Sequence, residues 1–269
     1  MSVTSEIAYA KLNLALHVRE RMADGNHRIE TIFAFCEDGD ELTAEESESI
    51  SLAVQGQFGA GLESDDNLVV RAAEALQRHS GSDRGANLRL QKNLPVASGV
   101  GGGSADAAAA LRLLNGLWGL DWPLDRLDEI GRELGADVPA CIHSAPMRGQ
   151  GRGDELEPVD LDLSGTPVLL VNPRVELSTA EVFGRWDGVD RGPLGDWRHG
   201  RNDLEPAAAS MAPQIGSIIA WLSTQDGAHC VRMSGSGATC FALFETEAQR
   251  DHAAEGVPRE WWRLTTRLR

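Results

Sequence analysis

The sequence predicts an α+β fold, because hairpin-like pairs of strands come first and strands and helices then alternate irregularly. Apolar residues alternate through Glu6–Val18 and recur through Arg28–Cys36, which predicts two strands. The run Ala23–His27 between them, ADGNH, is typical of a turn. A second turn is expected at 38–42, DGDEL, and a third strand with an acidic edge at 43–54. This order argues against a doubly wound parallel sheet.

The middle of the chain is predicted to be mainly helical. Periodicity and capping residues predict a helix over Asp65–Gly81, and a short amphipathic helix ending at glycine is expected over Asp125–Gly135. Between them we expect a strand at 86–94, then a glycine-rich segment and a helix that runs to about Leu117. The sequence ADVPACI, at 136–142, is expected to enter a further strand.

The rest of the chain is predicted to mix strands and helices. A buried strand is expected at Thr166–Pro173, and a helix follows with Ser178 as its cap and Glu181 three residues later. The remaining expected elements are a glycine-rich turn at 148–156, one or two helices within 201–225, strand, glycine turn and strand at 227–245, a helix at 246–257 and a strand at 260–268. The segment 187–203 resembles a linker, and the boundary between two lobes, 1–157 and 158–269, is expected near Pro158.

Composition limits the class of function. The net charge of −16 argues against a general nucleic-acid binder, which needs a basic face, but it leaves room for a small phosphorylated ligand. The N-terminal sequence has no basic region followed by an apolar run, and no stretch approaches a membrane span, so we expect a cytoplasmic protein without a membrane partner. The four cysteines lack metal-ligand spacing, so we expect reduced thiols and no structural metal. Monomer and homodimer both stay open.

The glycine-rich segment PVASGVGGGSADAA is the clearest candidate site. It lacks the Lys-Ser/Thr that ends a Walker loop, and it is a poor dinucleotide fingerprint. Exposed backbone N–H groups ahead of a helix N-terminus nevertheless form an anion site, and glycine lets a phosphate approach closely. Ser104 is expected to cap this helix or to bind phosphate. The structural alternative is a tight strand-to-helix turn.

Three further features stand out. Only two of the 25 basic residues are lysines, Lys11 and Lys92, and a flexible ammonium is not interchangeable with the planar fork of arginine. Asp137, in GADVP, is either a functional carboxylate or a turn or cap residue. The glycines of MSGSGATC predict a tight loop between two strands.

Together these pieces resemble the GHMP kinase superfamily. The matching stretches are AYAKLNLALHV, ADGNHRIETIFAF, DNLVVRAAEAL, KNLPVASGVGGGSADAAAAL, LGADVPACI, NPRVELSTAEVF, RNDLEP and MSGSGATCFALFE, in order over nearly the whole chain. The resemblance implies a two-lobed fold, with a ribosomal-protein-S5-domain-2-like N-terminal lobe and a ferredoxin-like C-terminal lobe. It implies ATP-dependent phosphorylation of a small alcohol. The motifs are most similar to those of the members that phosphorylate the 2-hydroxyl of the cytidine diphosphate ester of 2-C-methyl-D-erythritol, in the non-mevalonate pathway to isoprenoids.

The resemblance also implies roles at matching positions. Asp137 would be the catalytic carboxylate and Lys11 would stand beside it to offset charge on the transferred phosphoryl group. The residues that would contact ATP are Asn67 and Lys92, near the adenine and ribose, and Pro95, Ala97, Ser98, Gly99, Val100, Gly101, Gly102, Gly103 and Ser104, around the phosphates. The residues that would contact the substrate are Asn13, His27 at the cytosine edge, Phe183 stacked on the ring, Thr179, Asp137 and Gly235. Mg²⁺ is expected to accompany ATP, held largely by phosphates and water.

The sequence departs from the family pattern at two positions. Asn26 stands where an aromatic residue usually precedes the histidine, so half of a cytosine sandwich is missing or supplied elsewhere; a lost stack weakens binding by about 1–3 kcal/mol. Ala105 stands where a second serine is common. Two alternatives therefore remain at this point: a kinase of the same superfamily for a mevalonate-like or sugar-like alcohol, and a non-catalytic nucleotide-binding module.

Overall fold

The computed structural model describes residues 3–62 and 66–269, and the chain forms two compact units. Unit 1 comprises Met1–Ala10, Asp38–Val96 and Gly102–Ser144, and unit 2 comprises Lys11–Glu37, Ala97–Gly101 and Ala145–Arg269. The long strands β1 and β2 and the glycine-rich segment each contribute to both units. The elements are β1 (Thr4–Arg21), β2 (His27–Ser47), β3 (Ile50–Gln55), α1 (Leu68–Ser80), β4 (Gly85–Gln91), α2 (Gly102–Leu117), α3 (Leu124–Leu134), α4 (Val138–His143), β5 (Met147–Gln150), β6 (Glu155–Pro158), β7 (Pro167–Asn172), α5 (Thr179–Gly184), η1 (Trp197–His199), α6 (Glu205–Met211), α7 (Gln214–Leu222), β8 (Ala228–Met233), β9 (Cys240–Phe244), α8 (Glu247–Glu255) and β10 (Trp262–Arg267).

Strands β1 and β2 form the expected hairpin around the turn at 23–26, where the N–H of Met22 donates to the carbonyl of Asn26 at 2.8 Å. The turn predicted at 38–42 is wrong, because β2 continues through these residues to Ser47. Two features of this stretch fit a strand rather than a turn. Asp40 is fully buried. A Cβ on Gly39 would lie 2.0 Å from the carbonyl oxygen of Ala8, so glycine allows the backbones of β2 and β1 to pass closely.

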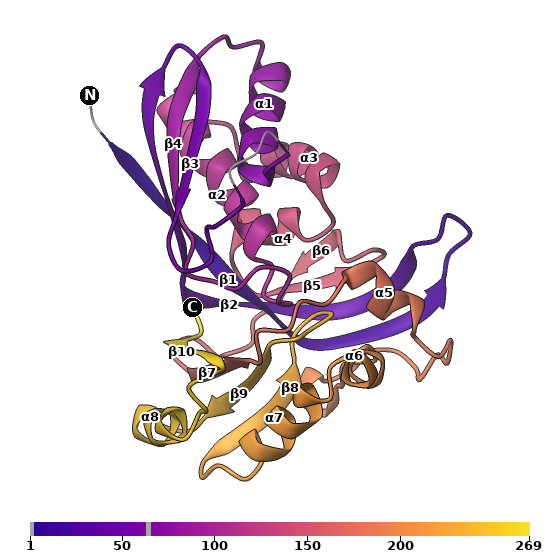
Figure 1. Ribbon diagram of the computed structural model, residues 1–269. Coiled ribbons are helices and arrows are strands. Elements are labelled where there is room, and N and C mark those ends of the chain that lie inside the picture. Colours follow the sequence, from indigo (N-terminus) through magenta and orange to yellow (C-terminus); the bar gives the residue numbers. More distant parts are fainter. Residues whose placement is uncertain (1–2, 63–65) are drawn as a thin grey trace. The chain divides into compact units, whose positions relative to one another are not determined.

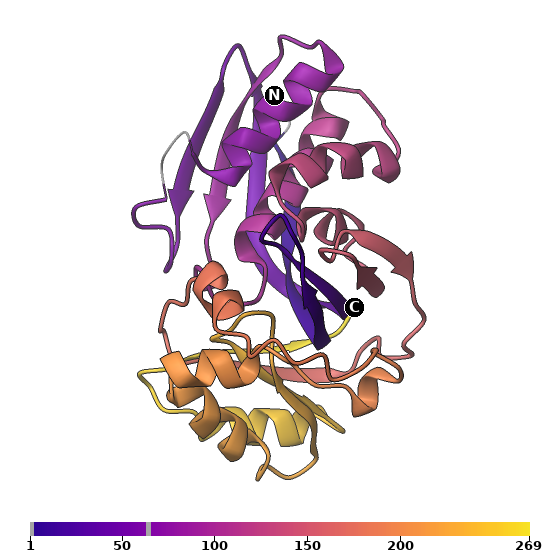
Figure 2. The same cartoon turned by 90° about the vertical axis from the view of Figure 1, so that its right-hand side faces the viewer.

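In unit 1, α1 packs against β3 of the sheet formed by β3, β4 and the C-terminal part of β2, and α2, α3 and α4 pack together with α1 (Figures 1 and 2). β4 pairs in parallel with β3 and antiparallel with β2. α1 begins after its N-cap Asn67 and ends at Ser80, followed by the C-cap Gly81 in the left-handed conformation. The predicted start of this helix, Asp65, lies outside the described residues. α2 packs against α1, α3 and α4, and its run of buried alanines lets these neighbours approach.

The strand predicted at 136–142 is also wrong, because Val138–His143 form the short helix α4. Pro139 lies in its first turn, where the missing backbone N–H has no intrahelical partner to lose. Five of the six α4 residues are buried, so the apolar run that resembled a strand is a buried helix.

In unit 2, β10, β7, β9 and β8 form an antiparallel sheet, and a β5–β6 hairpin extends the N-terminal part of β2. Every residue of β7 and β9 is buried. Helices α7 and α8 pack against this sheet and share one core with β7 and β9 (Figure 1). The strands and helices predicted between 166 and 268 are confirmed in type.

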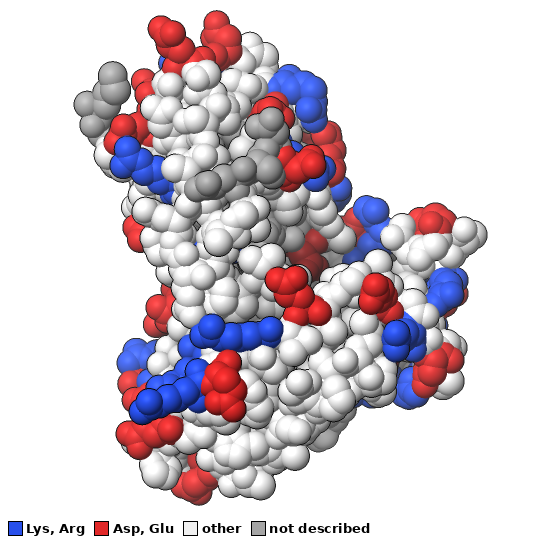
Figure 3. Space-filling view, in the orientation of Figure 1, with Lys and Arg blue, Asp and Glu red and all other residues white. Residues whose placement is uncertain are grey.

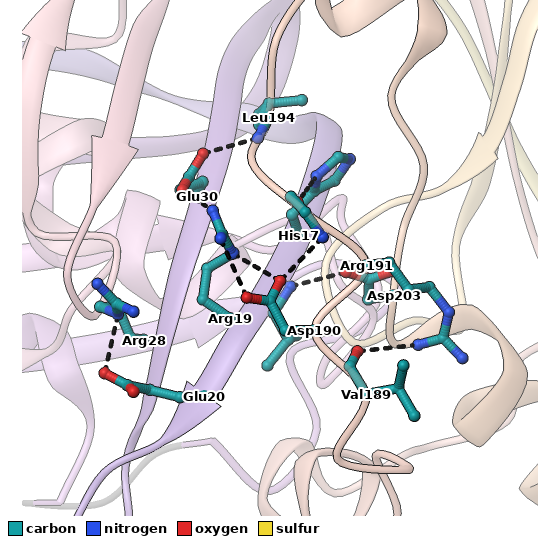
Figure 4. Close-up of polar contacts among 12 residues, drawn as sticks. His17, Arg19, Glu20, Arg28, Glu30, Val189, Asp190, Arg191, Leu194 and Asp203 are labelled. Atoms are coloured by element: carbon teal, nitrogen blue, oxygen red, sulfur yellow. Dashed lines mark hydrogen bonds and ion pairs between the residues drawn. The ribbon is translucent and has the colours of Figure 1, made fainter.

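The segment 187–203 is not a linker, although it contains little regular structure. Leu194 and Trp197 are buried within it, and Arg19 holds it to the hairpin by binding Asp190 at 2.8 and 3.0 Å (Figure 4). Glu30 accepts from the N–H of Leu194 at 2.7 Å and from Arg19 at 2.5 Å. Charged side chains and the buried pair Leu194 and Trp197 therefore fix a glycine-rich strap on β1 and β2.

The surface fits the acidic composition. On the face drawn in Figure 3, acidic and basic side chains are interspersed, and most blue side chains lie near red ones. Among residues 3–62 and 66–269, no helix combines the length and the apolar character needed to cross a membrane.

Candidate active site

The first half of the glycine-rich segment, 97–101, is built into unit 2. The N–H of Lys11 on β1 donates to the carbonyl of Val100 at 2.9 Å. Gly99 and Gly101 have φ of +81° and +69°, and a Cβ on Gly101 would lie 2.9 Å from Cε of Lys11. Glycine at these positions therefore permits both the left-handed backbone and the close approach of the Lys11 side chain. The exposed Ala97 also has a positive φ, of 49°.

The loop between β8 and β9 docks on the same stretch. The N–H of Thr239 donates to the carbonyl of Ser98 at 3.0 Å, and Oγ of Ser234 donates to the carbonyl of Gly99 at 2.9 Å. A Cβ on Gly235 would lie 3.0 Å from the carbonyl oxygen of Gly99. The glycines of MSGSGATC thus serve close packing against the glycine-rich segment, within unit 2.

Lys11 lies on a buried polar chain. Its Nζ donates to Oδ1 of Asn13 at 2.8 Å and lies 5.4 Å from the centre of the Phe33 ring. Nδ2 of Asn13 donates to Oγ1 of Thr31 at 2.8 Å. Lys11 and Asn13 are each 2% exposed. The two residues predicted to act at the phosphoryl group and at the substrate are therefore direct partners, two positions apart on β1.

The second half of the glycine-rich segment belongs to unit 1 and begins α2. Because the helix begins at Gly102, Ser104 lies inside its first turn, and the prediction that Ser104 caps the helix is wrong. The side chain stays available for the alternative role at a phosphate. Ala105, where a second hydroxyl was expected, is buried. Pro95, at the start of the glycine-rich segment and also in unit 1, is buried as well.

Lys92 lies within unit 1 between two buried carboxylates. Its Nζ contacts Oδ2 of Asp40 and lies 2.6 Å from Oδ2 of Asp106, and all three side chains are at least 95% buried. Burial lowers the pKa of Lys92, but the charges of Asp106 and Asp40 outweigh it, so the pKa is raised and the ammonium stays charged. Burial raises the pKa of Asp106 to about 7, against the opposing effect of Lys92. The Cβ position of Gly102 lies 3.0 Å from Nζ of Lys92, so this triad supports the start of α2.

Two predicted residues of unit 1 occupy helix starts. Asp137 stands at the N-cap position of α4 with helical backbone angles and makes no side-chain cap hydrogen bond, so the cap interpretation of its carboxylate does not hold. Asn67 does cap its helix: Oδ1 accepts from the N–H of Val69 at 2.9 Å, and Nδ2 donates to the carbonyl of Leu62 at 2.8 Å. Asn67 therefore has a structural role, and its nucleotide contact stays a prediction.

An aromatic cluster joins the hairpin end to α5 in unit 2. The ring centres of His27 and Phe183 are 5.0 Å apart, and those of His27 and Trp186 are 5.8 Å apart in an edge-on arrangement. Burial and the nearby Arg21 lower the pKa of His27, which favours the neutral ring. Thr179, at the start of α5, shares a hydrogen bond of 2.9 Å with Ser236 of the β8–β9 loop. The sequence did not point to Trp186, because the stretch that resembles the family, NPRVELSTAEVF, ends at Phe183.

One group of metal-binding residue types occurs among the described residues, in unit 1. Ligand atoms of Asp125, Asp128 and His143 lie within 4.8 Å of one another. Nε2 of His143 bonds to Asp128 at 2.8 Å, and this hydrogen bond raises the pKa of His143. The hydrogen bond between His143 and Asp128 accounts for the arrangement.

Comparison with known proteins gives the family. Models described as the GHMP kinases N terminal domain and GHMP kinases C terminal match residues 67–145 and 190–264. A protein of Rhizorhabdus wittichii named 4-diphosphocytidyl-2-C-methyl-D-erythritol kinase is 54% identical, over 98% of this chain and 94% of the relative. A protein of the same name from Novosphingobium aromaticivorans is 51% identical, over 98% and 92%. The chain belongs to the 4-diphosphocytidyl-2-C-methyl-D-erythritol kinases of the GHMP kinase superfamily.

Solved structures agree with this membership. A crystal structure of 4-(cytidine 5'-diphospho)-2C-methyl-D-erythritol kinase matches with a TM-score of 0.85 and 30% identity, over 98% of this chain and 99% of that one. A homoserine kinase from Cytophaga hutchinsonii matches with a TM-score of 0.70 at 16% identity, which shows the common fold alone. The predicted α+β GHMP kinase fold is thereby confirmed. The expected lobe boundary, between residues 157 and 158, falls in the interval between the two family matches and stays a prediction.

Proposed function

We propose that the chain transfers the γ-phosphoryl group of ATP to the 2-hydroxyl of 4-diphosphocytidyl-2-C-methyl-D-erythritol, in the non-mevalonate route to isoprenoid precursors. The observation that carries the proposal is the 54% identity with a kinase of this name along 98% of the chain. The retained Lys11 and Asp137 favour a catalyst over a non-catalytic nucleotide-binding module.

In the proposed reaction the 2-hydroxyl oxygen forms a bond to the γ-phosphorus, the bond from this phosphorus to the bridging oxygen breaks, and ADP leaves. Asp137 accepts the hydrogen bond of the hydroxyl, orients it for attack and takes up the proton that the hydroxyl loses as the new bond forms. Lys11 offsets the negative charge on the transferred group. Asn13 binds the substrate near the reacting hydroxyl and holds Nζ of Lys11 at 2.8 Å.

The glycine-rich segment has the properties that an ATP phosphate site needs. Glycines at 101 and 102 leave space that a Cβ would fill, next to the side chains of Lys11 and Lys92 respectively. The first turn of the 16-residue helix α2 presents backbone N–H groups and the hydroxyl of Ser104. Mg²⁺ bound with ATP would neutralise phosphate charge, and the phosphates and water would supply most of its ligands.

The cytidine end of the substrate is proposed to bind at the cluster of His27, Phe183 and Trp186. A neutral imidazole offers one donor and one acceptor, which suits the hydrogen-bonding edge of cytosine. Phe183 supplies an aromatic face on α5, and Thr179 lies at the start of the same helix. Gly235, next to Ser236, would line the substrate from the β8–β9 loop.

The test is the variant Asp137→Asn, assayed with ATP, Mg²⁺ and the named substrate. We expect kcat to fall by about 10²–10⁴-fold, since the amide neither takes up a proton nor carries charge. Asp83→Asn, at an exposed carboxyl of unit 1, serves as the matched control and should retain parental kcat. If Asp137→Asn kept kcat within a few-fold of the parent, the assignment of Asp137 would be wrong.

A further inference from the structure

Thr31 extends the chain of buried hydrogen bonds that runs from Lys11 through Asn13. Thr31 lies on β2, is fully buried, and belongs to unit 2 together with Lys11, Asn13 and Ala15. Its Oγ1 donates to the carbonyl of Ala15 at 2.7 Å and receives Nδ2 of Asn13 at 2.8 Å. Oδ1 of Asn13 in turn accepts from Nζ of Lys11 at 2.8 Å.

The direction of each hydrogen bond in this chain follows from the first one. The Thr31 hydroxyl has a single proton, and the carbonyl of Ala15 can only accept, so that proton is committed. Thr31 can therefore only accept from Asn13, which must present its NH₂ group. The amide oxygen then faces Lys11, whose ammonium can only donate. With the opposite amide orientation, two donors would meet at Lys11.

The main-chain end of Asn13 does not set this orientation. Its N–H donates to Oγ of Ser234 at 3.2 Å, which fixes the backbone against the β8–β9 loop but leaves the amide free to rotate about its terminal torsion. Two side-chain contacts distinguish the ends of the amide: the ammonium of Lys11 takes the oxygen, and the hydroxyl of Thr31 holds the NH₂ group. Because Lys11 and Asn13 are each 2% exposed, solvent is poorly placed to substitute for a lost partner.

We propose that Thr31 is a positioning residue for phosphoryl transfer: it orients the Asn13 amide and thereby fixes Nζ of Lys11. The inference rests on the proposed function for the role of Lys11, but the hydrogen-bond chain itself does not. Thr31→Val keeps the shape of the side chain and removes the hydroxyl. We expect kcat to fall roughly 10- to 100-fold with little change in the KM for ATP, since a buried NH₂ group loses its acceptor and the amide that binds Nζ of Lys11 is no longer held in one orientation.

Matched variants separate positioning from a general loss of structure. Thr31→Ser keeps the hydroxyl and should retain kcat within about threefold of the parent. Thr43→Val makes the same change elsewhere on β2, at a residue outside this chain of contacts, and should leave kcat unchanged. In an Asn13→Ala background, Thr31→Val should cause no further loss, because the group through which it acts is gone. Losses that multiply in that background would overturn the proposal, as would a kcat for Thr31→Val within twofold of the parent.

A second readout is independent of turnover and uses the two lysines of the chain. Protein labelled with ¹³C at lysine Cε should give two lysine signals by NMR, from Lys11 and Lys92. Thr31→Val should shift the Lys11 signal and leave the Lys92 signal, from unit 1, in place as a marker of folding. If that variant did not fold, Thr31→Ala would test the same loss of hydroxyl. An unmoved Lys11 signal would refute the positioning role. A shifted signal in a protein whose parent does not phosphorylate the named substrate would instead refute the proposed function alone.

Discussion

The buried triad of Lys92, Asp40 and Asp106 makes stability depend on pH in an unusual direction. Asp106 is 3% exposed, and burial raises its pKa from 3.8 to about 7, although Lys92 lies 2.6 Å away. A carboxyl with a raised pKa binds more protons in the folded than in the unfolded state between these two values. The contribution of this carboxyl to stability therefore falls as pH rises from about 4 to about 7 and changes no further above that.

The magnitude follows from the shift. Well inside this window each pH unit removes about 1.4 kcal/mol from the free energy of unfolding, and the slope halves at pH 7, so about 2 kcal/mol is lost between pH 5 and pH 7. Asp106→Asn removes the titrating group while keeping an oxygen acceptor for Lys92. The variant should gain stability relative to the parent by this amount across the window.

Urea unfolding of both proteins at several pH values between 5 and 8, with linear extrapolation, measures this difference. Glu129→Gln, at an exposed carboxyl on α3, is the control, and its curve should run parallel to that of the parent. If the curves of Asp106→Asn and the parent also ran parallel from pH 5 to pH 7, Asp106 would be ionised throughout. The account of the triad would then be wrong.

Two further predictions concern the site. Gly101→Ala should reduce kcat roughly tenfold or more, because the φ of Gly101 is +69° and the new Cβ would lie 2.9 Å from Cε of Lys11. The control is Gly116→Ala, whose new Cβ would have no atom within 4 Å. It should leave kcat unchanged and raise the free energy of unfolding by about 0.5–1 kcal/mol. Steady-state kinetics and urea unfolding check both, and equal kcat values for the two variants would contradict the packing argument. Asn26→Tyr should lower the KM for the cytidine substrate by up to about tenfold by adding a stacking ring, and an unchanged KM would mean that another group, such as Trp186, already fills that role.

Most secondary structure could be predicted because its signals are local. The hairpin around 23–26, the helices α1 to α3 and the buried strand β7 all follow from alternation, caps and glycine stops. The glycine-rich segment was recognisable because a strand, bare backbone and a strong helix former occur in succession. The structure adds what each glycine does: Gly101 makes room for Lys11 and Gly102 lies next to Lys92.

The errors arose where a distant partner overrides the local pattern. DGDEL has the composition of a turn, but Asp40 is held inside by Lys92, 52 positions later, and by the N–H groups of Asn93 and Leu94. ADVPACI resembles a strand until its packing against α2 and α3 is known. The role of Thr31 was equally inaccessible, because it depends on a bond to Asn13 across two strands.

The central claim is that this chain phosphorylates 4-diphosphocytidyl-2-C-methyl-D-erythritol. The most direct measurement supplies the purified protein with ATP, Mg²⁺ and equal amounts of this substrate, mevalonate, homoserine and galactose, and identifies the products by mass spectrometry and ³¹P NMR. We predict one phosphorylated product, the cytidine diphosphate ester with a new phosphomonoester at the 2-position, formed in equal amount to ADP. Phosphorylation of another alcohol in preference to this one, or binding of ATP without transfer to any of them, would contradict the claim.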